Sequence, residues 1–348
     1  MDYIGMDVHK RDTQVCIIDG DRTVVLEQRI RTEPRRFADV LGSRARTRIV
    51  LEASTESEWV TAALETLGHE VIVADPNYRP MYGTRSRRVK TDRRDARALA
   101  EANRVGAYRA AHRLPAARRE LRAALAVREA LVQTRTRYLL VLRSLLRREG
   151  IAVPTGSAAT FARRLETVTI PAALAPVVAP VHALLAPLNA ALATADATIA
   201  AHLTAEPAAA RLQSVPGVGP LTAATVIATL DTPTRFPSAG HVAAYLGLVP
   251  REWSSGERQH RGGVTKTGNR RARAMLVQAA WGVWRDRHAA SAGLRQWAER
   301  LAARRGKRVA VVALARRLSG ILFALWRDDT PFCPDHVGTP FGTGRVAA

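Results

Sequence analysis

Residues 3–7 read Tyr-Ile-Gly-Met-Asp, an apolar run that ends on a carboxylate. Further apolar segments follow it, and the pair Asp19-Gly20 is typical of a β-hairpin turn. The pattern predicts three strands in succession, at residues 3–9, 12–18 and 22–30. We therefore expect the chain to begin with a sheet whose first strands are antiparallel neighbours.

Helices and strands alternate after these three strands. The pattern predicts, in order, a helix at 34–42, a strand at 47–52, a helix at 56–68 and a strand at 70–75. This is the order of the ribonuclease-H-like fold, although other α/β folds begin in the same way. We expect residues 1–108 to form an α/β domain built on a mixed sheet.

The rest of the chain has the pattern of helices. Residues 115–149 combine many arginines with leucines at helical spacing, at positions 121, 125, 131, 139, 142 and 146. An Ala-rich region interrupted by prolines follows, to about residue 210. Residues 109–210 should form helical hairpins or a coiled coil, which could be a plain connector or a dimerisation element.

An α-helical C-terminal domain is expected over residues 211–330. Helices are predicted at 221–230, 236–248, 270–288 and 307–326, with a polar segment at 251–269. Residues 331–348 contain repeated Pro and Gly and are expected to be a tail.

The composition indicates a polyanionic partner. Lys and Arg total 53 against 31 Asp and Glu, which gives a formal net charge of +22. A GC-rich coding bias would explain why only four of the basic residues are lysines, but not their excess over the acids. Neutralising phosphates releases their condensed counterions, so such a charge favours nucleic-acid binding.

Cysteine use and hydropathy bear on the compartment. The two cysteines, Cys16 and Cys333, lie far apart and have no metal-ligand spacing, which fits a reducing cytoplasm. No window approaches about 18 uninterrupted apolar residues, so no membrane span is expected. We expect a cytoplasmic, nucleoid-associated protein.

Four acidic residues have positions that suit a metal site. Asp7 lies within an apolar strand, where a carboxylate is costly unless it is paired or bound to a cation, and Glu52 ends another such strand. Asp92 and Asp95 are three residues apart at a predicted helix start, so they share one face. Two Mg²⁺ (or Mn²⁺) ions ~3.5–4 Å apart would relieve the repulsion and clamp a phosphodiester. The alternative is that Asp92 only caps its helix, with Asp95 in an ordinary first turn.

A glycine-containing turn and two basic clusters are candidate nucleic-acid contacts. Gly217 and Gly219 stand in Val-Pro-Gly-Val-Gly-Pro, which leads into a helix. Such a turn could present backbone N–H groups to a phosphate, as a helix-hairpin-helix element does. The alternative is a tight interhelical turn without a ligand. The basic candidates are Arg88, Lys90, Arg93, Arg94, Arg258, Arg261, Lys266, Arg270 and Arg271. Ser255 lies at the start of the second cluster, a Gly-rich basic loop, but no His-Asp partner nearby identifies it as a nucleophile.

The order of these motifs resembles one family along nearly the whole chain. It is similar to the bacterial insertion-sequence transposases that have a DEDD catalytic domain, a group that includes the pilin-gene invertases. The motifs are residues 3–7, Leu-Glu-Ala-Ser at 51–54, Lys-Thr-Asp-Arg-Arg-Asp-Ala at 90–96, Val-Pro-Gly-Val-Gly at 215–219, Phe236 through Leu248, and Ser-Gly at 255–256 ahead of Lys-Thr-Gly-Asn at 266–269.

The resemblance implies specific roles. Asp7, Glu52, Asp92 and Asp95 match the Mg²⁺-binding acids of a RuvC-like domain, and Ser255 matches a serine that forms a covalent phosphoserine link with DNA. Ser254 precedes it, and Gly256 after it favours Ser255. Homo-oligomers, a dimer or a tetramer, are implied, in which one subunit's acids complete a site with another's serine. A structured non-coding guide RNA is implied as a partner besides the DNA of element ends and target.

Three alternatives remain open. A structure-specific nuclease, such as a Holliday-junction resolvase, would need the acids and the basic surface but not Ser255. An architectural or RNA-binding protein would need no working acid site, and the intact set of acids argues against it. An invertase of the same family would share all these motifs.

Overall fold

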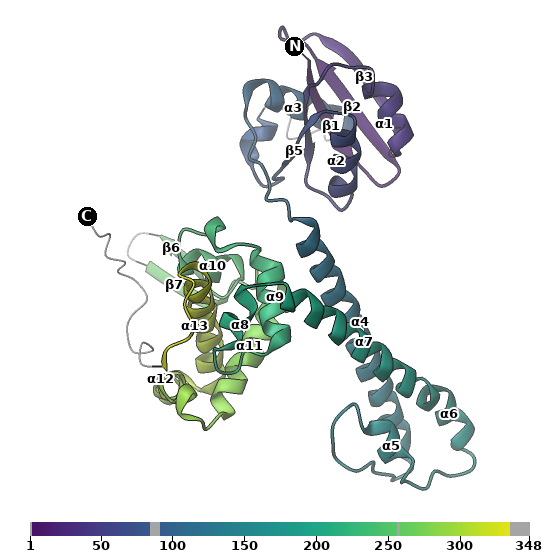
Figure 1. Ribbon diagram of the computed structural model, residues 1–348, viewed down its shortest axis with the longest axis vertical. Helices are drawn as coiled ribbons and strands as arrows, with labels where there is room; N and C mark the ends of the chain where they lie inside the picture. The colour runs from purple at the N-terminus through teal and green to yellow at the C-terminus, as the bar shows by residue number, and fades with distance from the viewer. Residues whose placement is uncertain (1, 84–90, 256–257, 335–348) are drawn as a thin grey trace. The chain divides into compact units, whose positions relative to one another are not determined.

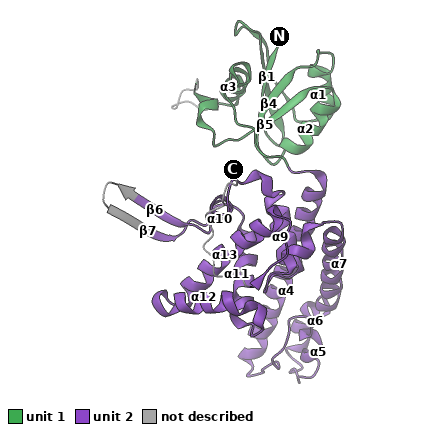
Figure 2. Ribbon diagram, turned by 60° about the vertical axis from the view of Figure 1, so that its left-hand side comes forward, with its two compact units in different colours: residues 1–113 green, residues 114–348 purple. Residues whose placement is uncertain are grey.

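The computed structural model describes residues 2–83, 91–255 and 258–334, and of residues 254, 255 and 258–261 the backbone alone. The chain divides into two compact units, residues 1–113 and residues 114–348 (Figure 2). The segments predicted as a middle region and a C-terminal domain thus belong to one compact unit. Arg88 and Lys90 lie outside the described residues.

A five-stranded mixed sheet forms the first unit (Figure 1). Its strands are β1 (Tyr3–Val8), β2 (Asp12–Ile18), β3 (Val24–Arg31), β4 (Arg48–Glu52) and β5 (Glu70–Ala74), in the order β3-β2-β1-β4-β5. The first three strands pair antiparallel, whereas β4 and β5 join β1 in parallel. The predicted strands and the mixed sheet are confirmed, and the architecture is consistent with a ribonuclease-H-like fold.

Helices complete the first unit. They are α1 (Pro34–Leu41), α2 (Ser57–Thr66) and α3 (Asp92–Val105), with a short 3₁₀ helix η1 (Arg79–Tyr82) before α3. The helices α1 and α2 bury Phe37, Leu41 and Leu64 in the same core cluster as Ile4 and Met6 of β1. Leu99 of α3 packs in a separate cluster.

Gly5 lets α3 lie directly on β1. A Cβ atom at this position would stand 2.2 Å from the backbone nitrogen of Ala100 and 2.3 Å from the carbonyl oxygen of Ala96. Both neighbours are backbone atoms, which cannot turn away as the end of a flexible side chain can. The close contact therefore needs glycine, and it places the start of α3 relative to the sheet.

The second unit begins with a helical arm. Helix α4 (Ala116–Arg148) packs against α7 (Leu185–Thr204), and α5 (Phe161–Leu165) and α6 (Ala175–Ala183) lie at the far end of the pair (Figure 1). Arg128 pairs with Asp196 and Arg135 donates to Asn189, so the two long helices run antiparallel. This is the helical hairpin that the leucine spacing predicts.

Two helical stretches have the length and hydropathy of a membrane span, Ala175–Thr204 and Lys307–Arg327. The second, α13, is a core helix that buries Leu314, Leu318 and Leu322. The first carries Asp196, which pairs with an arginine of α4. Burial in the core accounts for the apolar character of α13, and length and composition by themselves are weak grounds for a membrane span.

Helices also form the body of the second unit. They are α8 (Ala208–Gln213), α9 (Pro220–Leu230), a 3₁₀ turn η2 (Pro233–Arg235), α10 (Ala239–Tyr245), α11 (Arg270–Arg285), α12 (Ala289–Arg305) and α13. One apolar cluster joins α9, α11 and α13 to the first turns of α4. Helix α12 is absent from the sequence prediction.

Two expectations for this unit are wrong. The helix expected at 236–248 begins only at Ala239, because Phe236 precedes Pro237 and takes an extended conformation. The segment expected as a basic loop is an antiparallel hairpin of β6 (Pro250–Ser255) and β7 (Arg258–Val264), which projects from the helical body (Figure 2). Its strands alternate no apolar residues, so the sequence pattern does not reveal them.

Candidate active site at the edge of the N-terminal sheet

Two neighbouring parallel strands bring the first two acids together. Asp7 lies near the end of β1 and Glu52 is the last residue of β4. The register of these strands pairs Met6 with Leu51, so each acid is the next residue along at the same level. The sheet thus places both carboxylates at one edge.

Helix α3 provides the other two acids. It begins at Asp92, and its first turn also contains Asp95, which is buried. The hydroxyl of Thr91 accepts a hydrogen bond from the N–H of Arg94 at 3.3 Å and is the N-cap. The alternative that Asp92 caps the helix is therefore wrong, and its carboxylate is not needed for that role.

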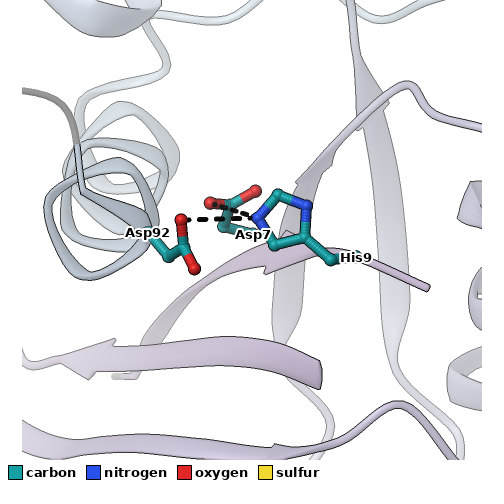
Figure 3. Close-up of side chains that lie close together, drawn as sticks. All are labelled: Asp7, His9 and Asp92. Atoms are coloured by element: carbon teal, nitrogen blue, oxygen red, sulfur yellow. Dashed lines mark ion pairs between the residues drawn. The ribbon is translucent and has the colours of Figure 1, made fainter. Parts of the chain in front are cut away.

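A histidine lies between two of these acids (Figure 3). The Nε2 atom of His9 is 3.4 Å from Asp7 Oδ2 and 3.5 Å from Asp92 Oδ1. One donor atom from each of the three residues falls within 4.8 Å of the others. Alternate residues of a strand share a face, so the spacing from Asp7 to His9 was a signal that the sequence prediction missed.

A tyrosine holds the second acid of the sheet edge. The hydroxyl of Tyr82 donates a hydrogen bond to Glu52 Oε2. Burial, the hydrogen bond to Glu52 and the charges of Asp95 and Asp7 raise the pKa of Tyr82 far above its usual value. Tyr82 thus stays a neutral donor, and it is the last residue of the short 3₁₀ helix η1, which no sequence pattern marks.

The electrostatics of the site concentrate on Asp7, whose side chain is 13% exposed. Burial, opposed by His9 and supported by the negative charges of Asp92, Asp95 and Glu52, raises the pKa of Asp7 to about 6. The four predicted acids are therefore close enough to act on one another. A divalent cation would relieve this repulsion, and the carboxylate oxygens are the donors that such a cation takes.

The basic residues near the acid site differ in whether they are free to contact a nucleic-acid phosphate. Arg93 forms an ion pair with Glu27, which Arg97 also contacts. Arg94 is exposed at the start of α3. A phosphate that binds Arg93 would have to displace Glu27. Arg94 takes part in none of the ion pairs that the structure describes, so it could bind a phosphate directly.

Ser255 belongs to the other unit, as the last residue of β6. Arg258 and Arg261 lie on the facing strand β7, and the side chains of all three are outside the described part of the chain. Beyond the hairpin, Lys266 and Arg270 are exposed. Arg271 instead forms an ion pair with Glu129 of α4, which fastens α11 to the arm.

The turn at 214–219 connects α8 to α9. Gly217 has a positive φ of 79°, and a Cβ there would stand 2.4 Å from the carbonyl oxygen of Ala279 in α11. Gly219 is the extended N-cap of α9 and would meet nothing within 4 Å. Packing on α11 accounts for Gly217, whereas Gly219 leaves the N-terminus of α9 open.

Family comparisons bear on both units. A model described as "Transposase", of the DEDD type of IS110 elements, matches residues 4–150, and one described as "Transposase IS116/IS110/IS902 family" matches residues 209–294. The "Probable family 20 transposase" of Pseudomonas aeruginosa is 32% identical over 95% of this chain and 98% of its own length. The chain belongs to the IS116/IS110/IS902 transposase family.

Other relatives agree with this assignment. The "Transposase for insertion sequence element IS1111A" of Coxiella burnetii is 28% identical over 95% of this chain and 91% of its own length. The "Pilin gene-inverting protein" of Moraxella lacunata is 29% identical over 36% of this chain and 38% of its own length. As a member of this transposase family, the chain acts on DNA in transposition or recombination, and its DEDD domain suggests use of a divalent metal.

Proposed function

We propose that the acids of this transposase bind divalent cations and act together with Ser255 in cleaving and rejoining DNA. The observation that carries the proposal is the meeting of β1, β4 and α3, which gathers Asp7, Glu52, Asp92 and Asp95 at one edge of the sheet. Bound there, Mg²⁺ or Mn²⁺ would neutralise the charge that develops on a phosphodiester.

In this proposal Ser255 of the second unit is the nucleophile, and the acids of the first unit bind the metal and accept a proton. The Ser255 hydroxyl attacks the phosphorus, the Oγ–P bond forms, and the P–O bond to the leaving deoxyribose breaks. The serine proton passes to a carboxylate of the acid site, and the leaving oxygen takes up a proton. Attack by the hydroxyl of the partner strand reverses these steps and releases the serine, so no ATP is consumed.

Nucleic-acid binding completes the proposal. Arg94, Lys266 and Arg270 are exposed, and the open N-terminus of α9 at Gly219 would present backbone N–H groups to a phosphate in the manner of a helix-hairpin-helix element. In addition, Arg88, Lys90, Arg93, Gly217, Arg258, Arg261 and Arg271 are proposed contacts. The resemblance to RNA-guided members supports a guide RNA as the source of target choice, and an oligomer in which the acids of one subunit serve the serine of another.

A cleavage assay tests the serine chemistry. Wild-type protein, Ser255→Ala and the neighbouring control Ser254→Ala would be incubated with Mg²⁺, DNA of the element's joined ends and any RNA that copurifies. We expect a protease-sensitive protein–DNA adduct on a denaturing gel for the wild type and Ser254→Ala, and none for Ser255→Ala. Metal-dependent nicking without an adduct, unchanged by Ser255→Ala, would mean a nuclease and would overturn the serine assignment.

A further inference from the structure

The imidazole of His9 occupies the position of a ligand. Its Nε2 atom lies 3.4 Å from Asp7 Oδ2 and 3.5 Å from Asp92 Oδ1, between residues that come from β1 and α3 (Figure 3). Asp92 and His9 are both about half exposed, at 50% and 55% of their side chains, so the site is open to solvent ions. Sequence motifs assign no role to this histidine.

The backbone at His9 is held in place independently of the acids. Its N–H donates to the carbonyl oxygen of Asp12 at 3.2 Å, and its own carbonyl accepts from the hydroxyl of Thr32 at 2.8 Å. The Thr32 hydroxyl is also 2.9 Å from that of Thr13, and both threonines are buried. The imidazole therefore projects toward the acids from a fixed point at the end of β1.

We propose that His9 is a further metal ligand, which adds an imidazole nitrogen to the carboxylates of Asp7 and Asp92 and favours Mn²⁺ over Mg²⁺. The inference rests on the proposed function, because it requires that the acid site binds a divalent cation. Mg²⁺ takes oxygen donors and holds its water tightly, whereas imidazole is a good ligand for transition metals. One nitrogen among the donors thus changes which ion the site prefers.

The rival explanation is that His9 is a counter-ion. A protonated imidazole between two carboxylates would form the same ion pairs and would be displaced when a metal binds. The two explanations differ in one property: a ligand nitrogen is bonded to the metal, and a displaced counter-ion is not. Electron spin-echo spectroscopy of bound Mn²⁺ detects a directly bonded nitrogen by its nuclear spin.

The experiment uses the full chain, loaded with Mn²⁺ alone. Protein labelled with ¹⁵N-histidine would be compared with unlabelled protein, with His9→Ala, and with His112→Ala as a control from the same unit. We expect an imidazole nitrogen coupling that changes with the label, disappears in His9→Ala and persists in His112→Ala. Mn²⁺ affinity, titrated by the signal of the free ion, should fall at least about tenfold in His9→Ala, because losing even an outer-shell partner costs that much.

Selectivity gives a second readout. His9→Gln replaces the nitrogen donor with an amide oxygen, so the ratio of Mn²⁺ to Mg²⁺ affinity should fall in competition titrations even where Mg²⁺ binding is kept. Mn²⁺ that binds in an Asp7-dependent manner without imidazole coupling would overturn the role of His9 and leave the proposed function intact. No Asp7-dependent binding of either ion would overturn the metal site itself.

Discussion

The acid site and the hairpin of β6 and β7, which carries Ser255, differ in how the surrounding structure supports them. The acids stand on β1, β4 and α3, elements that are packed in the apolar clusters of the first unit. Ser255 stands on β6, which pairs with β7 in a two-stranded sheet. Isolated two-stranded hairpins are marginally stable, so the attachment at the hairpin's base must position it.

That attachment is made of backbone contacts. The N–H of Thr265 donates to Val249 at 2.9 Å, and that of Lys266 donates to Gly247 at 3.1 Å. A Cβ at Gly247, where φ is +67°, would stand 2.2 Å from the carbonyl oxygen of Thr267. The acids are therefore preorganised by a core, whereas the position of the serine depends on the close-packed base of its hairpin.

The largest expected effect comes from breaking the core support of the acids. Gly5→Ala forces a Cβ into the backbone of α3, so we expect a loss of about 3 kcal/mol in the stability of the first unit and a loss of Mn²⁺ binding. Urea unfolding followed by hydrogen exchange would separate the two units, because only amides of residues 1–113 should lose protection.

Gly20→Ala is the matched control for Gly5→Ala. A Cβ at Gly20 would meet nothing within 4 Å, so its effect should stay within about 0.5 kcal/mol. If both variants were equally stable and bound Mn²⁺ equally, the acids would not depend on the contact between α3 and β1.

A smaller effect is expected from pH. The pKa of Asp7 is raised to about 6 in the fold, so the folded state binds more protons than the unfolded state between about pH 4 and 6. Metal-free protein should therefore lose about 2–3 kcal/mol of stability as the pH rises through this window, relative to Asp7→Asn. Denaturant titrations at several pH values would measure the loss, and Mn²⁺ added at pH 7 should reverse it. A pH-independent difference between the two proteins would contradict the raised pKa of Asp7.

The smallest effect should follow from removing the hydroxyl of Tyr82. Tyr82→Phe removes the donor to Glu52, which should cost about 1–2 kcal/mol and about tenfold in Mn²⁺ affinity. Tyr78→Phe, on the same segment, is the control and should leave the affinity unchanged. Equal affinities for both variants would show that the sheet alone positions Glu52, which would sharpen the contrast with the hairpin.

Much of the first unit could be predicted because its elements follow simple patterns. Short apolar runs mark β1, β2 and β4, and the acids Asp7 and Glu52 interrupt or end such runs. The hairpin of β6 and β7 escaped prediction because its strands carry no apolar face, and α12 because its apolar residues are only weakly concentrated on one face. Burial creates the periodicity that sequence reading relies on, so exposed strands leave little trace.

Sequence patterns were enough to predict the order of strands and helices in the first unit, and they show the excess of positive charge and the positions of the four acids along the chain. The packing of the folded chain is what makes Thr91 rather than Asp92 the cap of α3, places His9 between two carboxylates, and lets Tyr82 donate to Glu52. Local patterns encode which face of an element is buried, because that depends on neighbours a few residues away. Contacts between side chains far apart in the chain depend on how the elements pack, and here the missing side chain of Gly5 allows that packing.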